Sequence, residues 1–358
     1  MPWAREGDNR IRMHVLQGLL HDELPIINDR LARETRELPE LVRAVAEHVL
    51  MAGGKRLRPL LTLLFFRCVA RGRAERDSSG PSSPSGHPDM YPLACSMEFL
   101  HSATLLHDDI LDGSDLRRGR TTAHLVYGKT ETILAGDVLL ALANRLVAEY
   151  GDARLSWRVA EAIMRTASGE IQELEWIKRP TLSLQHYLEI ITGKTAYLIQ
   201  AACHCGALAA GGDEQAAQAA LDYGINLGIA FQLTDDALDY SARAEVAGKP
   251  VGNDLREGKL TLPLIGYLET LPEAECQEIL DWVRALGAAA DPGALSAQDL
   301  ARHGRVVQAV RDAGCVEKTR DRAAQYIVLA EEALTSLPEC PERVALQEAL
   351  QHTLHREK

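Results

Sequence analysis

Two short acidic segments of the chain share one pattern, in which two adjacent aspartates are followed, after two apolar residues, by a third. The first copy reads DDILD from Asp108 to Asp112, and the second reads DDALD from Asp235 to Asp239. Each copy follows an apolar run typical of a buried helix. Because helical residues four positions apart lie on the same face, the outer two carboxylates of each copy should stack. Like charges at that spacing destabilise a helix, and a bound cation would remove this cost.

The ligand types in these segments indicate a hard metal ion. Carboxylates with no histidine or cysteine in register suit Mg²⁺ first and Mn²⁺ second. Mg²⁺ usually takes one or two carboxylates and lets substrate phosphates complete its shell, so two carboxylate pairs fit several ions that clamp one diphosphate. Neither copy has the alternating ligands and central glycine of a calcium loop. One copy alone could equally be a solvated acidic face, and the repetition favours a metal site.

Basic residues recur beside glycines, where they would suit an anionic substrate. They occur in the segments MAGGKRLRPL, ITGKTAYL and AGKPVGNDLREGKLTLP. A glycine-rich backbone at a helix start can bind phosphate, although the spacing is not that of a P-loop. Any one of these residues alone could be a surface residue. The residues concerned are Lys55, Arg56, Arg58, Lys194, Thr195, Lys249 and Lys259.

Helical periodicity dominates the elements that must position these residues. Alanine and leucine are abundant and β-branched residues are sparse, and no alternating strand pattern bounded by turn dipeptides occurs. The segments 135–148 and 198–210 are apolar nearly all round and should be central helices. The periodicity predicts helices over residues 11–35, 39–51, 60–70, 91–112, 131–150, 154–177, 183–210, 213–241, 261–270, 273–286, 296–312, 315–336 and 341–355.

These elements predict a single all-α domain over residues 1–358. Residues 72–90 are rich in Gly, Ser and Pro and should form a flexible loop. This loop could mark a domain boundary, but we interpret it as an insertion between two helices of one domain.

Composition excludes several classes of protein. A net charge of -12 argues against binding nucleic acid through its phosphates. Seven cysteines without a CxxC pair indicate reduced thiols in a cytoplasm, and adjacent ligands such as Cys203 and His204 diverge on a helix. The first residues lack the apolar region of a secretory signal, and no stretch approaches the ~18–20 apolar residues of a membrane span. We therefore expect a soluble, cytoplasmic protein with no nucleic-acid partner and no membrane span.

Taken in order, the motifs resemble a known family. They are GGKRLRP, HSATLLHDDILD, LRRG, AGD, GKT, FQLTDDALDY and GKPVGNDLREGKLTLP. The chain is similar to the trans-isoprenyl diphosphate synthases over residues 15–355, and most similar to the bacterial medium- and long-chain enzymes of octaprenyl and decaprenyl type. Residues 74–90 are longer than in the family pattern and lie away from the motifs. The resemblance implies the isoprenoid synthase fold, an all-α bundle around a deep central cavity, in a homodimer.

The resemblance also implies a role for each motif residue. Asp108 and Asp112, with Asp109 in support, would bind two Mg²⁺ ions, and Asp235, with Asp236 and Asp239 in support, would bind a third. The catalytic group would comprise these six aspartates with Lys194 and Lys249. Residues that hold the diphosphate of isopentenyl diphosphate would be Lys55, Arg58, His101 and Arg118. Residues around the allylic diphosphate would be Arg117, Lys194, Thr195, Gln232, Lys249 and Lys259.

The implied activity is the Mg²⁺-dependent condensation of isopentenyl diphosphate with an allylic diphosphate to an all-trans polyprenyl diphosphate, for example for a quinone side chain. The chemistry agrees, because metals and fixed cations stabilise the charge on a departing diphosphate. Apolar helices would keep water from the allylic cation. Ala103 and Thr104, about one turn before Asp108, are small where short-chain enzymes of this family often place an aromatic residue. They predict a product longer than twenty carbons.

Three alternatives stay open. The chain could be a short-chain farnesyl or geranylgeranyl diphosphate synthase. It could be a non-catalytic subunit of a heteromeric synthase, although such subunits typically lose an aspartate motif. A terpene cyclase would carry an NDxxSxxxE motif, and here Glu257 stands where that serine should follow Asn253. The sequence leaves undetermined the exact chain length, the allylic primer, a homodimer against a heteromer, and the role of residues 72–90.

Overall fold

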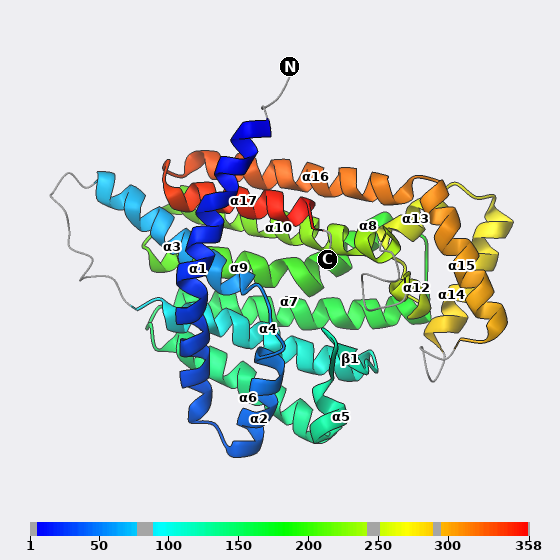
Figure 1. The fold of residues 1–358 in the computed structure, drawn as a ribbon, viewed down its shortest axis with the longest axis horizontal. Coiled ribbons are helices and arrows are strands. Elements are labelled where there is room, and N and C mark those ends of the chain that lie inside the picture. The colour runs from blue at the N-terminus through cyan, green and yellow to red at the C-terminus, as the bar shows by residue number, and fades with distance from the viewer. Residues whose placement is uncertain (1–5, 77–88, 242–250, 289–294, 357–358) are drawn as a thin grey trace. The chain divides into compact units, whose positions relative to one another are not determined.

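The structure is a computed structural model that describes residues 6–76, 89–241, 251–288 and 295–356. By its internal contacts the chain divides into two compact units (Figure 1). The first unit comprises Met1–Ile163, Leu198–Ile225 and Leu329–Gln351. The second comprises Met164–Tyr197, Asn226–Val328 and His352–Lys358. The single domain over residues 1–358 stays a prediction.

Helix α4 (Tyr91–Leu111) is the central element of the first unit. It packs against α1 (Glu6–Arg36), α2 (Glu40–Leu50), α3 (Leu57–Arg76), α5 (Ala123–Tyr127) and α6 (Lys129–Ala148) (Figure 1). Its contact with α6 depends on a glycine, because a Cβ added at Gly136 would come within 2.3 Å of Nε2 of His107. The AGD segment of the sequence thus allows the two helices to lie close together.

The two segments expected to be apolar all round differ in the structure. In α9 (Tyr197–Ala209) every residue from Ala201 to Leu208 is buried, which confirms the prediction for that helix. In α6 the prediction was wrong, because Asp137, Ala141 and Arg145 are exposed. One face of α6 packs on the core while the other faces outward. Because the segment is mostly apolar, its composition could not indicate which face is buried.

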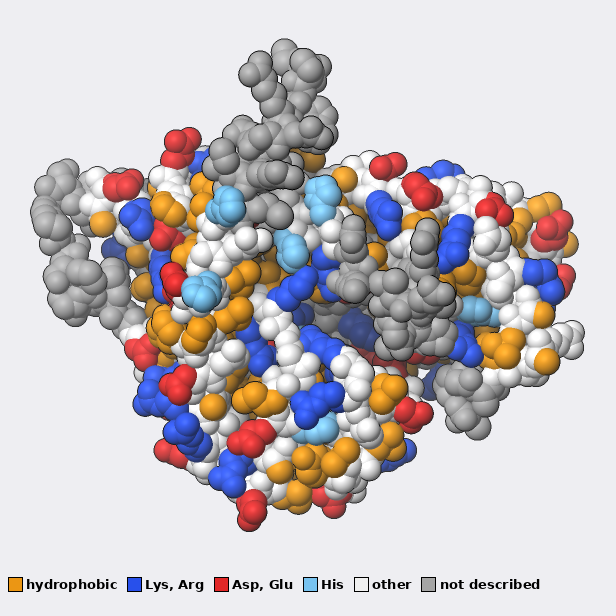
Figure 2. Space-filling view, viewed as in Figure 1, with side chains coloured by type: hydrophobic (Ala, Val, Ile, Leu, Met, Phe, Trp, Pro, Cys, Tyr) orange, Lys and Arg blue, Asp and Glu red, His pale blue; other side chains and the backbone are white. Residues whose placement is uncertain are grey.

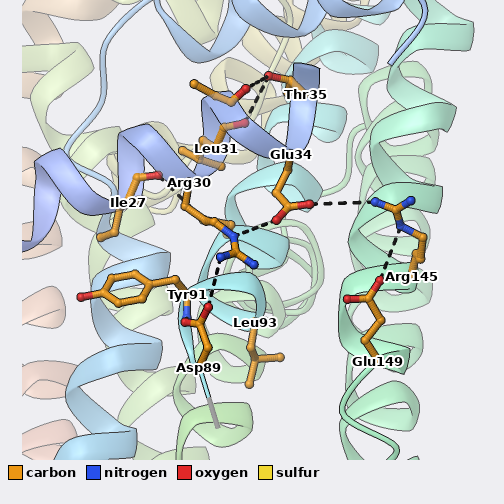
Figure 3. Close-up of polar contacts among 12 residues, drawn as sticks. Ile27, Arg30, Leu31, Glu34, Thr35, Asp89, Tyr91, Leu93, Arg145 and Glu149 are labelled. Carbon is orange, nitrogen blue, oxygen red and sulfur yellow. Dashed lines mark hydrogen bonds and ion pairs between the residues drawn. The ribbon is translucent and has the colours of Figure 1, made fainter. Parts of the chain in front are cut away.

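A polar network holds the start of α4 in the first unit (Figure 3). Arg30 of α1 donates from Nε to Glu34 at 2.7 Å and lies 3.1 Å from Asp89 through Nη1. Asp89 accepts the backbone N–H of Tyr91, the first residue of α4, at 3.1 Å. Glu34 also lies 3.9 Å from Arg145 of α6. These contacts link α1 and α6 to the start of the helix whose other end carries the first acidic motif.

The remaining helices complete both units. In the second unit α13 packs against α8 and α15, and α12 packs against α14. Helices α7, α10, α16 and α17 contribute residues to both units. The bounds are α7 (Ala153–Lys178), α8 (Leu184–Ile191), η2 (Thr192–Ala196), α10 (Glu214–Ser241), α12 (Asn253–Arg256), α13 (Leu262–Leu268), α14 (Glu273–Gly287), α15 (Ala297–Asp312), α16 (Cys315–Ala333), η3 (Leu334–Ser336) and α17 (Pro341–Leu354).

The all-α class is confirmed, with one strand pair that the sequence pattern missed. Strands β1 (Leu116–Arg117) and β2 (Arg120–Thr121) form an antiparallel hairpin. Both turn residues, Arg118 and Gly119, adopt positive φ values of 53° and 75°, as a two-residue hairpin turn requires. Strands of two residues are too short to show an alternating pattern.

Two helix predictions also need correction. The helix expected over 183–210 is interrupted by the π-helix η2, and residues 72–76 of the expected loop belong to α3. Residues 77–88 of that loop lie outside the described residues. Within the described part of the chain, no helix is both long and apolar enough to cross a membrane.

Candidate active site

The first acidic motif lies at the end of α4. The N–H of Asp112 donates to the carbonyl oxygen of Asp108 at 2.8 Å, so the helical geometry continues through the motif. Both side chains are half-buried, whereas Asp109 is buried and accepts a hydrogen bond from Nε of Arg117 at 2.7 Å. Burial raises the pKa of Asp109, and Arg117 opposes that shift. The predicted pair of outer carboxylates is thus present on one face, with the middle aspartate turned to the protein.

The GGKR segment lies against the hairpin that follows this motif. A Cβ added at Gly54 would come within 2.7 Å of Nη1 of Arg118. Arg56 and Arg118 adopt positive φ values of 48° and 53° although neither is glycine. Such strained conformations persist where the surrounding structure holds them. Arg56 is held by bonds to Glu98 and to the carbonyl oxygen of Leu50, each at 2.6 Å, so it fixes the loop.

A cationic cluster of Arg56, Arg58, Arg117, Arg118 and His101 results from this arrangement. The Nε donor of Arg58 is buried and has no hydrogen-bond acceptor among the described residues. Burial, together with nearby Arg118, lowers the pKa of Arg58 to about 10. Burial and the charges of Arg58, Arg118, Arg117 and Arg56 hold the pKa of His101 well below its ordinary value. A neutral imidazole among arginines, next to an unsatisfied donor, fits an anion such as a diphosphate.

The second acidic motif lies within α10, and its three carboxylates have different partners. Asp239 accepts the backbone N–H groups of Asn253 and Asp254, at 3.0 and 3.1 Å, and so caps the start of α12. Asp236 is buried, and Asp235 is half-buried and pairs with Arg356 at 2.7 Å. Of this motif, Asp235 has the carboxylate best placed to reach a metal.

Asp236 ends a chain of hydrogen bonds that contains two predicted site residues. The hydroxyl of Thr195 donates to Oε1 of Gln232 at 2.9 Å, and Nε2 of Gln232 donates to Asp236 at 2.9 Å. The hydroxyl of Tyr187 donates to the other oxygen of Asp236. Burial is the main cause that raises the pKa of Asp236 to about 7. The structure thus brings Thr195 and Gln232 to one aspartate, and Tyr187 is a member that the sequence did not indicate.

Glutamates hold the two described lysines that are predicted to lie around the allylic diphosphate. Nζ of Lys194 lies 2.8 Å from Glu170 and 2.6 Å from Glu173. Nζ of Lys259 lies 2.7 Å from Glu257 and 3.9 Å from Glu173. Sequence reasoning missed Glu170 and Glu173 because they lie on α7, far along the chain from both lysines. It also did not consider Glu257, which stands two residues before Lys259, as a partner. The third lysine of that group, Lys249, lies outside the described residues.

A glycine contact positions Lys194 beside its partners. A Cβ added at Gly169 would come within 2.4 Å of the backbone nitrogen of Lys194. The π-helix η2 therefore lies directly on α7 at this point. In the sequence, the available signal for this close contact of η2 with α7 was the glycine at position 169, directly before Glu170.

A small cavity in the second unit collects these groups. Its volume is about 90 Å³, and apolar residues such as Trp176 and Ile190 form part of its wall. Its polar lining comprises Glu173, Tyr187, Lys194, Thr195, Gln232, Asp236, Asp254, Lys259 and Thr261. The deep central cavity implied by the resemblance stays a prediction.

The two residues predicted to influence chain length occupy different faces of α4. Ala103 is fully buried, while Thr104 is half-buried and donates its hydroxyl to the carbonyl oxygen of His101 at 2.8 Å. His101, Thr104, Asp108 and Asp112 form a half-buried stripe, as their helical spacing requires.

The predicted metal ligands are single carboxylates and not a preformed cluster. Among the described residues, no three His, Cys, Asp or Glu side chains converge into a metal cluster. The half-buried carboxylates of Asp108, Asp112 and Asp235 nevertheless suit Mg²⁺, which needs few protein ligands when phosphates complete its shell. At Cys203–Cys205, Nδ1 of His204 accepts a hydrogen bond from Nε of Arg158 at 2.9 Å, which occupies that nitrogen.

These features define an all-α enzyme with the isoprenoid synthase fold. The chain belongs to the polyprenyl synthetase family, whose sequence model matches residues 39–291, and it is a trans-prenyltransferase. It is 32 % identical to octaprenyl diphosphate synthase from Escherichia coli (strain K12) over 339 residues, which cover 94 % of this chain and 96 % of that protein.

Two further comparisons agree with this family. The chain is 32 % identical to the short chain isoprenyl diphosphate synthase of Methanothermobacter thermautotrophicus over 350 residues, 96 % of this chain and all (100 %) of that one. A solved polyprenyl synthase from Caulobacter crescentus CB15, complexed with calcium and isoprenyl diphosphate, superposes with a TM-score of 0.83. It is 35 % identical, and the match covers 97 % of this chain and 98 % of that one.

Proposed function

We propose that this prenyltransferase condenses isopentenyl diphosphate with an allylic diphosphate and forms an all-trans polyprenyl diphosphate longer than twenty carbons, for example for a quinone side chain. The observation that carries the proposal is the stripe of His101, Asp108 and Asp112 on α4, beside a cationic cluster with an unsatisfied buried donor on Arg58. Similarity to octaprenyl diphosphate synthase over nearly the whole chain supports the longer product.

A short-chain synthase is the second candidate, and the short chain relative, also 32 % identical, favours it. Small side chains at Ala103 and Thr104 favour the longer product, because they leave room for a growing tail.

Mg²⁺ is the metal that we assign to Asp108, Asp112 and Asp235, in three ions, with Mn²⁺ as the second choice. The calcium in the Caulobacter crescentus complex supports a divalent metal in this family. When bound, the metal would act as a Lewis acid on the departing diphosphate. The other three aspartates of the motifs are bonded to protein groups and would position these ligands.

Two groups of residues, most of them cationic, would bind the two substrates. For isopentenyl diphosphate we assign Lys55, Arg58, His101 and Arg118. For the allylic diphosphate we assign Arg117, Lys194, Thr195, Gln232, Lys249 and Lys259. Fixed positive charge favours the transition state because negative charge grows on the leaving group. The glutamates that hold Lys194 and Lys259 would orient their ammonium groups toward that charge.

The assembly that we propose is a homodimer. Large apolar side chains of the first unit are exposed at the end of α4, on β1, on α5 and at the start of α6. Figure 2 shows apolar side chains on the surface in the region of α5. They are Leu111, Leu116, Leu125, Val126, Ile133 and Leu134, each 43–56 % exposed. A second copy is the occupant that we assign to this surface, and light scattering of the purified protein measures the assembly state.

A cytoplasmic location is also our proposal. All seven cysteines are free in the described structure, as is usual for a reducing compartment.

One assay tests the proposed activity. Purified protein is incubated with Mg²⁺, isopentenyl diphosphate and farnesyl diphosphate, and the products are separated by chromatography. We expect products beyond twenty carbons. A product of twenty carbons or fewer would identify a short-chain synthase. Absence of elongation that a partner protein restores would identify a subunit of a heteromer, and absence under all conditions would refute the synthase proposal.

A further inference from the structure

Arg356, which follows helix α17, pairs with the first aspartate of the second acidic motif. Its Nη1 donates a hydrogen bond to Oδ1 of Asp235 at 2.7 Å. Its guanidinium carbon lies 4.6 Å from the centroid of the Phe231 ring. Phe231 and Asp235 are four residues apart on α10, so the ring and the carboxylate share one face of the helix. The ring therefore supports the guanidinium plane while an N–H group reaches the carboxylate.

This pair is partly shielded from solvent. The side chain of Arg356 is 18 % exposed and that of Asp235 is 36 % exposed. A guanidinium always carries its charge and has five N–H donors in a planar fork, which matches carboxylates and phosphates alike. Arg356 can therefore exchange one anionic partner for another without any change in its own charge.

A divalent metal and Arg356 compete for the same carboxylate. Mg²⁺ binds carboxylate oxygens at about 2.0–2.1 Å, closer than a guanidinium nitrogen can approach. A metal on Oδ1 of Asp235 would therefore meet a like charge at short range unless Arg356 turned away. By linkage, each of the two cations weakens the binding of the other. A diphosphate brought in with the metal offers Arg356 a new acceptor nearby.

We propose that Arg356 is a positioning residue. Its guanidinium pairs with Asp235 in the absence of ligands, and it moves to the diphosphate when a metal–diphosphate pair binds. This inference rests on the metal site proposed above. Transfer makes metal binding weak without diphosphate and strong with it. Arg356 therefore couples the two ligands, so that the metal at Asp235 is loaded together with the substrate.

The test measures binding of Mn²⁺ to the full chain, by the electron paramagnetic resonance of free Mn²⁺, with and without inorganic diphosphate. Asp108→Asn with Asp112→Asn silences the first motif, so that bound Mn²⁺ in the absence of diphosphate reports Asp235. In that background we expect Arg356→Ala to bind Mn²⁺ alone about two- to fivefold more tightly, because a partly exposed competing ion pair is lost.

When diphosphate is the ligand measured, Arg356→Ala should weaken binding instead of strengthening it. With both acidic motifs intact and saturating Mn²⁺, Arg356→Ala should bind inorganic diphosphate about tenfold more weakly, because a charge-assisted hydrogen bond is missing. Arg356→Lys keeps the charge without the planar fork and should fall between Arg356→Ala and the unmodified protein. Phe231→Leu removes the supporting ring and should strengthen binding of Mn²⁺ alone, by less than Arg356→Ala does.

Arg320→Ala is the matched control, because it also removes one charge from the second unit. Arg320 is exposed, and its Nη2 donates to the hydroxyl of Ser241 at 3.0 Å, two residues beyond the acidic motif, and not to a carboxylate of the motif. If Arg356→Ala and Arg320→Ala behave alike in both measurements, or if Arg356→Ala weakens both binding steps, the coupling role is wrong while the metal site stands. If the unmodified chain binds neither Mn²⁺ nor diphosphate, both the metal site and the coupling role are wrong.

Discussion

The two acidic motifs share one spacing but have different surroundings. In the first, Asp108 and Asp112 lie half-buried on one face of α4, and Asp109 is buried against Arg117. In the second, on α10, Asp239 caps α12 and Asp236 is buried against Tyr187 and Gln232. In the first motif the outer two carboxylates are therefore the metal ligands that we propose, whereas in the second we assign a metal to Asp235 alone.

The chain that follows each motif accounts for this difference. Helix α4 ends at Leu111, and the hairpin that follows returns Arg117 to the middle aspartate. Helix α10 continues to Ser241, and the backbone of α12 lies against the last aspartate. In our assignment, the repeated sequence pattern supplies a pair of metal ligands in one place and one metal ligand with two structural supports in the other.

The largest expected effect is on the rate. Asp108→Ala and Asp235→Ala should each lower the elongation rate on the order of 10³-fold, because each removes a carboxylate assigned to a metal on the leaving group. Radiolabelled isopentenyl diphosphate measures this rate, and circular dichroism checks the fold. The control is Asp115→Ala, since Asp115 is exposed and lies outside both motifs. Unchanged turnover in either motif variant would refute the metal assignment for that motif.

Substitution of the last aspartate should affect stability in the second motif and metal binding in the first. Asp239→Ala should cost about 0.5–2 kcal/mol of unfolding free energy, because the side-chain acceptor at the start of α12 is lost. Asp112→Ala should leave the unfolding free energy nearly unchanged and weaken Mn²⁺ binding instead. Urea unfolding and Mn²⁺ titration of both variants measure these effects. Equal loss of stability in the two would mean that the motifs are structurally alike.

Substitutions just before the two motifs should differ in their effect on product length. Ala103 and Ala230 each stand five residues before the first aspartate and are fully buried. A phenylalanine at either site should cost about 1–3 kcal/mol through overpacking. Ala103→Phe should also shorten the product, while Ala230→Phe should not. Chromatography of the polyprenyl products decides this, and an unaltered product from Ala103→Phe would place the tail elsewhere.

The smallest expected effect is a dependence of stability on pH that arises beside the first motif. Burial and nearby arginines hold the pKa of His101 below its ordinary value. The unfolded chain therefore takes up a proton at His101, near pH 6.5, that the folded chain refuses, so folding stability falls as the pH drops below that value. The slope from one such group cannot exceed about 1.4 kcal/mol per pH unit.

Urea unfolding at pH 7.5 and pH 5.5 measures this dependence. His101→Asn should reduce the loss of stability between the two, and His21→Asn is the control, since His21 is an exposed residue of α1. A variant that loses as much stability as the unmodified protein would show that His101 does not titrate in this way.

Much of the fold and of the candidate site follows from local sequence. The stacking of Asp108 on Asp112, the apolar burial of α9 and the position of Pro59 in the first turn of α3 depend on residues within a few positions of one another. Helical geometry relates such residues directly. The family also follows from the order of the motifs, because each motif is itself local.

Tertiary structure decided which groups each site residue meets. The pairs Lys194–Glu173, Tyr187–Asp236 and Arg356–Asp235 join residues 21, 49 and 121 positions apart. No local rule relates residues so distant, because their contact depends on how helices pack and where glycines allow close approach. The sequence alone therefore determined that two acidic motifs exist and lie on helices. Packing decided that they are unequal, because each carboxylate takes the partner that the neighbouring element brings to it.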